Sequence, residues 1–177
     1  PVTASIMWAR QLMRRIEEPM VKFQANKNLM STKESKKIVK TYNRIARTIV
    51  EFETLWHLAW SKSIEQSKAG LQATLIIRHP SNGRLDVNFD REIVQLIRET
   101  KCLLRMGVEA PESAKMVLLQ EHKFKAYYNK LSYALEQYEE VVAKIMPITG
   151  ARLKPHLADM ERKVQPGMVT LTWTSMN

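Results

Sequence analysis

Residues 38–59, with the sequence IVKTYNRIARTIVEFETLWHLA, decide the fold class of this chain. Their apolar residues recur at alternating spacings of four and three: Ile38, Tyr42, Ile45, Ile49, Phe52, Trp56 and Ala59. A repeat of 3.5 residues keeps one seam of a helix facing a partner helix. We therefore expect a helix over about residues 33–66, close to 50 Å long at roughly 1.5 Å per residue. On this seam, we expect the rings of Tyr42 and Trp56 to be part of a core.

The rest of the chain extends the helical pattern. Apolar stripes predict further helices over about residues 3–24, 90–106, 112–146 and 151–164. The expected N-caps are Thr3 or Ser5, Ser31 or Thr32, and Asp90, and Gly107 is the expected left-handed C-cap. Pro19 should kink or break the first helix, and Pro166-Gly167 should end the last one before a short extended segment over residues 168–173.

One segment has a different periodicity. Over residues 73–89, two short alternating runs flank Pro80-Ser-Asn-Gly83, and Asn82-Gly83 is expected to supply the positive φ angles of a tight hairpin turn. An isolated two-stranded hairpin is marginal in water, so it must pack on other elements. The predicted fold class is mainly α: an elongated helical bundle with a small inserted β-hairpin, forming a single segment over residues 1–177.

Composition sets the broad class of protein. The 177 residues include 28 Lys or Arg and 18 Asp or Glu, which gives a formal charge of +10. Apolar residues make up 45% of the chain, there is one cysteine, and no apolar run approaches the roughly 20 residues that span a bilayer. These features favour a soluble, intracellular, basic protein. Because position 1 is not Met, we also expect a processed chain or a fragment.

The sequence shows no motif of a self-contained enzyme. Its five glycines are at least 13 residues apart, which excludes glycine-rich phosphate loops, and its four histidines are at least 22 residues apart, which excludes an HExxH pair. We therefore assign no catalytic, cofactor-binding or metal-binding residues.

A basic face is the candidate functional feature. Five cations follow the same four-three spacing on the long predicted helix: Lys33, Lys37, Lys40, Arg44 and Arg47. Such a stripe is either a solvated face or a surface for an acidic partner or a phosphate backbone. Nucleic-acid proteins of the helical kind add a recognition helix or stacking aromatics to such a stripe, whereas here the aromatics lie on the apolar seam. A basic module for nucleic acid or an anionic membrane surface is therefore the alternative function.

Several motifs in order carry a family resemblance. They are Trp8-Ala-Arg-Gln-Leu-Met-Arg-Arg-Ile-Glu-Glu-Pro19, Leu85-Asp-Val-Asn-Phe-Asp90, Glu99-Thr-Lys-Cys-Leu103 with Gly107 and Pro111 after it, and Val164-Gln-Pro-Gly-Met-Val-Thr-Leu-Thr-Trp-Thr-Ser175. Together they resemble the N-terminal tail region of axonemal, outer-arm dynein heavy chains. Met168 stands where that family often has Leu, and Ala110-Pro111 where Ile-Pro is common; apolar exchanges of similar size are tolerated in packed positions.

The resemblance implies a piece of a large ATP-driven microtubule motor of cilia and flagella. The implied role is structural: assembly of the complex and force transmission through an elongated series of helical bundles. The implied partners are dynein intermediate chains, light chains and other heavy chains, with the microtubule doublet contacted indirectly, and no nucleic acid or membrane. ATP and Mg are implied only for the motor domain, outside this chain. The implied location is the cytoplasm, the cytoskeleton and the axoneme of a cilium or flagellum.

Overall fold

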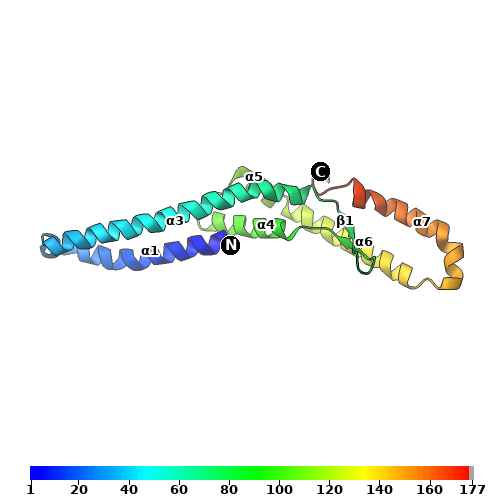
Figure 1. Cartoon of the computed structure of the whole chain (residues 1–177), viewed down its shortest axis with the longest axis horizontal. Helices are drawn as coiled ribbons and strands as arrows, with labels where there is room; N and C mark the ends of the chain where they lie inside the picture. The colour runs from blue at the N-terminus through cyan, green and yellow to red at the C-terminus, as the bar shows by residue number, and fades with distance from the viewer. Residues whose placement is uncertain (176–177) are drawn as a thin grey trace. The chain divides into compact units, whose positions relative to one another are not determined.

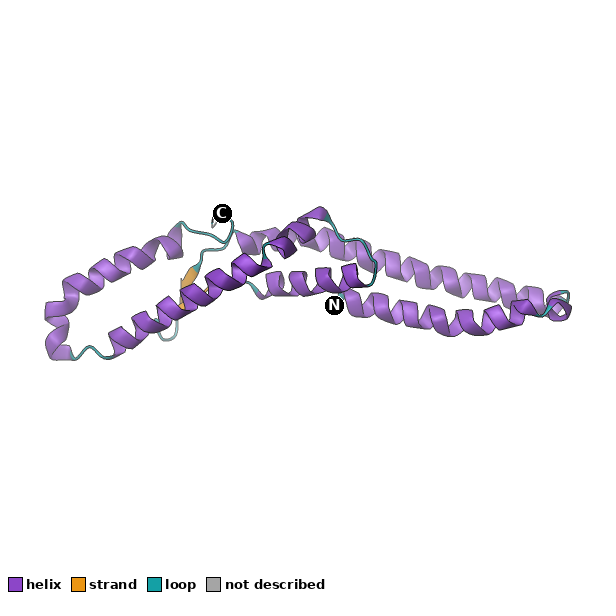
Figure 2. Cartoon of the chain, turned by 180° about the vertical axis from the view of Figure 1, so that it is seen from behind, coloured by secondary structure: helices purple, strands orange, loops and turns teal. Residues whose placement is uncertain are grey.

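Helices dominate the structure, a computed structural model that describes residues 1–175, without the side chains of residues 65–69 (Figure 1). The described residues form seven helices and one two-stranded antiparallel sheet: α1 (Val2–Ala25), α2 (Lys27–Met30), α3 (Lys33–Leu71), β1 (Ile76–Arg78), β2 (Leu85–Val87), α4 (Arg91–Arg105), α5 (Glu112–Leu119), α6 (Glu121–Ala143) and α7 (Pro147–Val169). Figure 2 shows how little of the chain is strand. The predicted mainly α fold with a small hairpin is confirmed.

The chain divides into two compact units. Unit 1 comprises residues 1–63 and 102–109, and unit 2 comprises residues 64–101 and 110–177. Helices α3 and α4 each contribute residues to both units. That residues 1–177 act as one segment stays a prediction.

Unit 1 is built on α1 and most of α3. Its small core contains Val2, Ile6 and Leu103, all almost fully buried. Helix α1 begins at Val2 without a side-chain cap, so the expected caps at Thr3 or Ser5 are wrong. It also continues through Pro19 to Ala25 instead of breaking. Proline costs the helix one backbone hydrogen bond, and buried apolar side chains on both sides of it, Ile6 and Met20 among them, favour the continued helix.

Local capping chemistry sets three other helix ends. The Thr32 side chain accepts a bond from the Ser35 N–H at 3.2 Å, as expected for an N-cap of α3. In unit 2, the Asp90 carboxylate accepts the Glu92 N–H at 2.8 Å at the start of α4. In unit 1, Gly107 ends α4 with a φ of 69°, and the next residue, Val108, donates its N–H to the Leu103 carbonyl at 2.9 Å. This is the Schellman arrangement, and all three predictions are confirmed.

The hairpin of unit 2 has a wider turn than predicted. Strands β1 and β2 pair Ile76 with Val87 and Arg78 with Leu85. In the turn, Gly83 has a positive φ of 70° and Asn82 does not, so the predicted tight turn with positive φ at Asn82 is wrong. The Asn82 side chain instead accepts the N–H of Arg84 at 3.0 Å, and this stabilises a longer loop without a left-handed Asn.

The core of unit 2 surrounds this hairpin. Eight buried residues make up the core cluster: Leu75, Ile76, Leu85, Ile93, Ile97, Phe124, Leu135 and Trp173. The segment after α7 returns to the hairpin, where Thr172 bridges Thr74 and the Trp173 indole N–H donates to the Asn88 carbonyl at 2.6 Å. The hairpin was expected to pack on other elements, and within this unit it does so.

Two predicted helix boundaries in unit 2 are wrong. The helix expected over residues 112–146 is divided into α5 and α6 at Gln120, whose N–H donates to the Val117 carbonyl three residues earlier at 3.2 Å, although apolar residues continue across the junction. Helix α7 begins at Pro147 and runs through Pro166 and Gly167 to Val169, instead of covering residues 151–164. The Pro-Gly pair does not end α7, because Gly167 is buried against Ile76 and lets the helix continue past the strand.

Candidate functional site

The predicted basic face lies on α3 in unit 1. All five of its cations (Lys33, Lys37, Lys40, Arg44 and Arg47) are exposed. No ion pair is described for any of the five among the residues that the structure covers. Residues 33–47 contain six Lys or Arg and one acidic residue, Glu34, so half of the chain's net charge of +10 comes from these four turns of helix. We call these five cations the basic face. The face presents uncompensated positive charge to solvent.

The apolar seam of α3 is less buried than its spacing predicts. Trp56 is 42% exposed and Ala59 is exposed, whereas Tyr42 is half-buried. The expectation that Trp56 belongs to a core is therefore wrong for this structure. The reason is that α1 covers only part of the seam, which was predicted from periodicity alone. Other large apolar side chains of α3 are also exposed: Ile38, Ile45, Val50, Leu55 and Leu58.

An apolar groove separates α1 from α3 at one end of unit 1. It has a volume of about 690 Å³ and is lined by Arg15, Ile16, Pro19, Met20, Phe23, Lys37, Ile38, Thr41, Tyr42 and Ile45. Of the five cations in the basic face, Lys37 alone lines it. Protein interiors are close-packed, so a groove of this size means that α1 and α3 do not pack fully against each other here.

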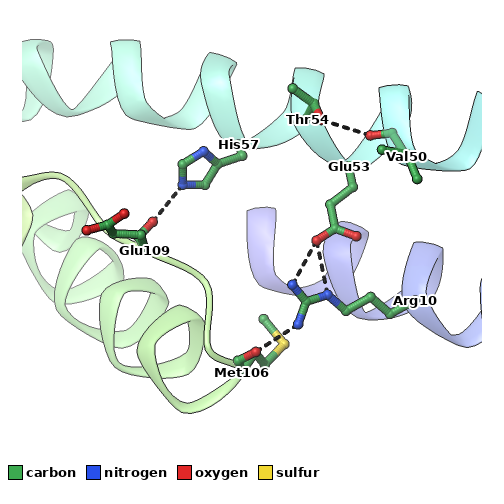
Figure 3. A network of polar contacts seen from close by, with 7 residues as sticks. All are labelled: Arg10, Val50, Glu53, Thr54, His57, Met106 and Glu109. Atoms are coloured by element: carbon green, nitrogen blue, oxygen red, sulfur yellow. Dashed lines mark hydrogen bonds and ion pairs between the residues drawn. The ribbon is translucent and has the colours of Figure 1, made fainter. Parts of the chain in front are cut away.

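A polar network holds the other end of unit 1 together (Figure 3). Arg10 on α1 pairs with Glu53 on α3 at 2.9 Å and donates to the Met106 carbonyl at 2.7 Å. Nearby, the His57 ring bonds the Glu109 carbonyl at 2.8 Å. Side-chain bonds thus join α1 to α3 and join both helices to the segment that follows α4. Sequence reasoning missed this network, because its partners are 43, 52 and 96 residues apart.

The described part of the chain shows no group of three His, Cys, Asp or Glu side chains that could hold a metal ion. Within that same part, every helix is too short or too polar to cross a bilayer. The single cysteine, Cys102, is exposed. The exposed charged and apolar side chains of α3 are therefore the chief candidates for function in unit 1.

Comparison with known proteins assigns these features to a family. The family described as "Dynein heavy chain, N-terminal region 1" matches residues 1–177. The chain is 56% identical to the dynein gamma chain of the flagellar outer arm of Chlamydomonas reinhardtii, over 100% of its own length. It is 40% identical to dynein axonemal heavy chain 5 of Mus musculus, also over its whole length.

A more distant relative extends the match to the inner arm. Over 97% of its length, the chain is 32% identical to the dynein-1-alpha heavy chain of the flagellar inner arm I1 complex of Chlamydomonas reinhardtii. The chain spans about 4% of the length of each of these three relatives. The alternative function, a module for nucleic acid or an anionic membrane, has no support in these comparisons.

Proposed function

The chain belongs to the dynein heavy chains, and we propose that it is a structural and assembly segment in the tail of an axonemal heavy chain. The single observation that carries this proposal is the match of all 177 residues to the N-terminal region of that family. Because its relatives are flagellar and axonemal heavy chains, the chain is placed in the axoneme of a cilium or flagellum. The proposed role there is to support complex assembly and force transmission in microtubule-based motility.

The long helix supports a mechanical role. Helix α3 contains 39 residues, close to 58 Å at roughly 1.5 Å per residue. The Arg10–Glu53 pair and the His57 bond join this helix to its neighbours in unit 1. A helix that is held by side-chain bonds resists bending better than a free one, which suits a segment that transmits force.

The basic face supports a docking role. Exposed cations without ion pairs attract an acidic partner surface over a distance of about one Debye length. We assign as proposed partners the intermediate chains, the light chains and other heavy chains of the arm, with the microtubule doublet contacted indirectly. The segment itself is proposed to have no catalytic role and to need no cofactor. ATP and Mg would act in the motor domain of the full-length protein.

Charge reversal tests the docking role. A full-length heavy chain with Lys37, Lys40, Arg44 and Arg47 changed to Glu should co-purify with less of its intermediate chain or of a second heavy chain than the unchanged protein does. The matched control changes four other exposed cations of α6 and α7, Lys123, Lys130, Arg152 and Lys154, to Glu, for the same change in net charge.

The measurement is the stoichiometry of the purified complex, with helix content checked by circular dichroism. Loss of partner in the first variant and not in the control supports the basic face. Unchanged stoichiometry in both variants would show that the basic face is a solvated surface and would leave the family assignment intact.

A further inference from the structure

Unit 2 contains a second surface, which the basic face does not explain. Helices α4 and α6 face each other across a cavity of about 440 Å³, a size in the range of ligand pockets. We call it the α4–α6 groove; it is lined by Phe89, Arg91, Val94, Ile97, Arg98, Lys101, Glu121, Phe124, Lys125, Tyr128 and Asn129. On each helix, these residues follow spacings of three and four, so each helix turns one continuous face toward the groove.

Positive charge exceeds negative charge in this groove. Four cations line it, against one carboxylate, that of Glu121. Lys101 lies 2.5 Å and Lys125 lies 2.8 Å from the Glu121 carboxylate, which is only 8% exposed. Hydrogen bonds from Lys101 and then Lys125 lower the pKa of Glu121 to about 2, against the effect of its burial. Glu121 is therefore ionised at neutral pH and is already matched by two lysines.

The other two cations of the groove are arginines that do not pair with Glu121. Arg91 and Arg98 are exposed side chains on the groove face of α4, and no ion pair is described for either within residues 1–175. They are seven residues apart, which is two turns of helix and roughly 10 Å along its axis. Arginine presents a planar fork that binds carboxylates through two bonds. The pair is thus spaced to meet two carboxylates of one partner element.

The walls of the groove are apolar and partly uncovered. Phe89 stacks edge to face on Tyr128, with ring centroids 6.2 Å apart, and lies 6.0 Å from the ring of Phe124. Tyr128 is 41% exposed, and Val94 is also exposed. An apolar side chain inserted among these rings would bury surface that the chain alone leaves in water.

We propose that the α4–α6 groove docks an acidic amphipathic helix of a partner protein. The helix places an apolar residue against Phe89 and Tyr128, and its carboxylates, about two turns apart, contact Arg91 and Arg98. Charge complementarity and the helical spacing on both sides favour this occupant over an extended or a basic segment. No residue of the basic face is involved, so the inference does not depend on the proposed function.

A charge-swap titration tests this inference. The probe is a fluorescently labelled synthetic peptide with leucines on one helical face and glutamates elsewhere, titrated against purified full-length heavy chain. Binding is followed by fluorescence anisotropy at low and at high salt. The test variant is Arg91→Glu with Arg98→Glu, and the matched control is Arg152→Glu with Lys154→Glu, which makes the same charge change on exposed positions of α7.

The groove variant should bind the peptide at least about tenfold more weakly than the control variant does, since two charge-assisted contacts are reversed. A second peptide with lysines in place of the glutamates should bind the groove variant better than it binds the unchanged chain. Tyr128→Ala, at an exposed site whose change should not unfold the chain, should also weaken binding of the first peptide.

Two results would overturn the proposal. In the first, the groove variant and the control variant bind the peptide equally well. In the second, a peptide with serines in place of its leucines binds as tightly as the original, because then charge alone causes the attraction and no apolar residue enters the groove.

Discussion

Units 1 and 2 bury their tryptophans to different extents: Trp60 of unit 1 is half-buried beside the core, two other tryptophans of that unit are exposed, and Trp173 of unit 2 is buried. In unit 1, Trp8 is 54% exposed and Trp56 is 42% exposed, although their rings both lie beside Phe52. In unit 2, Trp173 is 2% exposed and contacts the rings of Phe89 and Phe124. Both units are helical, and both have amphipathic elements. They differ in how far other elements of the same unit cover the apolar faces of its helices.

Unit 2 covers more of these faces because its chain returns to its own hairpin. The segment after α7 pairs with Thr74, two residues before β1, and its Trp173 bonds the Asn88 carbonyl, so strands and helices close on one core. In unit 1, the last turn of α4 adds Leu103 to a smaller core with Val2 and Ile6, Ala9 and Met20 are also buried, and the rings of Trp8 and Trp56 stay exposed. An exposed apolar face of this kind is typical of an interaction surface. The comparison therefore suggests that unit 2 is stable by its own packing and that unit 1 depends on contacts with other parts of an assembly.

Removal of the closing tryptophan is the strongest test of this view. Trp173→Ala in the 177-residue chain should lower the free energy of unfolding by about 3–5 kcal/mol, because a large buried ring and its bond to Asn88 are lost. Denaturant unfolding, followed by circular dichroism, measures this change. A loss below about 1 kcal/mol would mean that the core of unit 2 does not depend on the returning segment.

The buried carboxylate gives the next largest expected effect. Glu121→Gln should lower the free energy of unfolding by about 1–3 kcal/mol at pH 7. The reason is that a neutral amide replaces the buried carboxylate, which weakens its bonds to Lys101 and Lys125. The folded pKa of about 2 is below the ordinary value of 4.5. This stabilisation is therefore complete above pH 4.5 and is lost as the pH falls toward 2.

Unfolding free energies measured across that range should show the loss in the unchanged chain and not in Glu121→Gln. The control is Glu140→Gln, which breaks an exposed pair with Lys144 and should cost about 0.5 kcal/mol or less. Equal costs for the two variants would contradict the buried role of Glu121.

Two glycines of α7 sharpen the comparison within unit 2. A Cβ at Gly167 would lie 2.7 Å from the Cδ1 atom of buried Ile76, whereas the nearest atom to a Cβ at Gly150, in Ile145, would be 3.8 Å away. Gly167→Ala should therefore destabilise the chain by about 1–3 kcal/mol through overpacking. Gly150→Ala should stabilise it by about 0.5–1 kcal/mol through helix propensity. Thermal unfolding of both variants measures the two shifts, and a Gly167→Ala variant as stable as Gly150→Ala would show that the strand does not press on α7.

Local features of this fold were predictable from the sequence because each depends on neighbouring residues. The heptad spacing predicted α3, and the capping chemistry of Thr32, Asp90 and Gly107 predicted three helix ends. The five cations of the basic face lie exposed on one helix because their spacing alone puts them there. Whether they bind a partner is a property of the assembly, and it stays a prediction.

Features that depend on distant residues were not predictable in this way. Trp173 bonds a residue 85 positions earlier, and this return brings its ring into the core cluster that contains Ile76 and Leu85 of the hairpin. The break at Gln120 interrupts a stripe whose periodicity gives no sign of it. Periodicity also cannot tell how much of a seam is covered, which is why Trp56 was assigned to a core and is found exposed.

Trp56 gives the smallest expected effect and tests the open character of unit 1. In the 177-residue chain, Trp56→Ala should lower the free energy of unfolding by less than about 1 kcal/mol, because a partly exposed ring loses little burial. The same denaturant titration as for Trp173→Ala measures it, so the two tryptophans are compared directly. A cost of about 3 kcal/mol or more would mean that the seam is already covered within the chain, and the contrast between the units would fail. If the cost is small in the isolated chain but co-purification of partner chains is lost in the full-length protein, the exposed seam of α3 is a surface that the assembly covers.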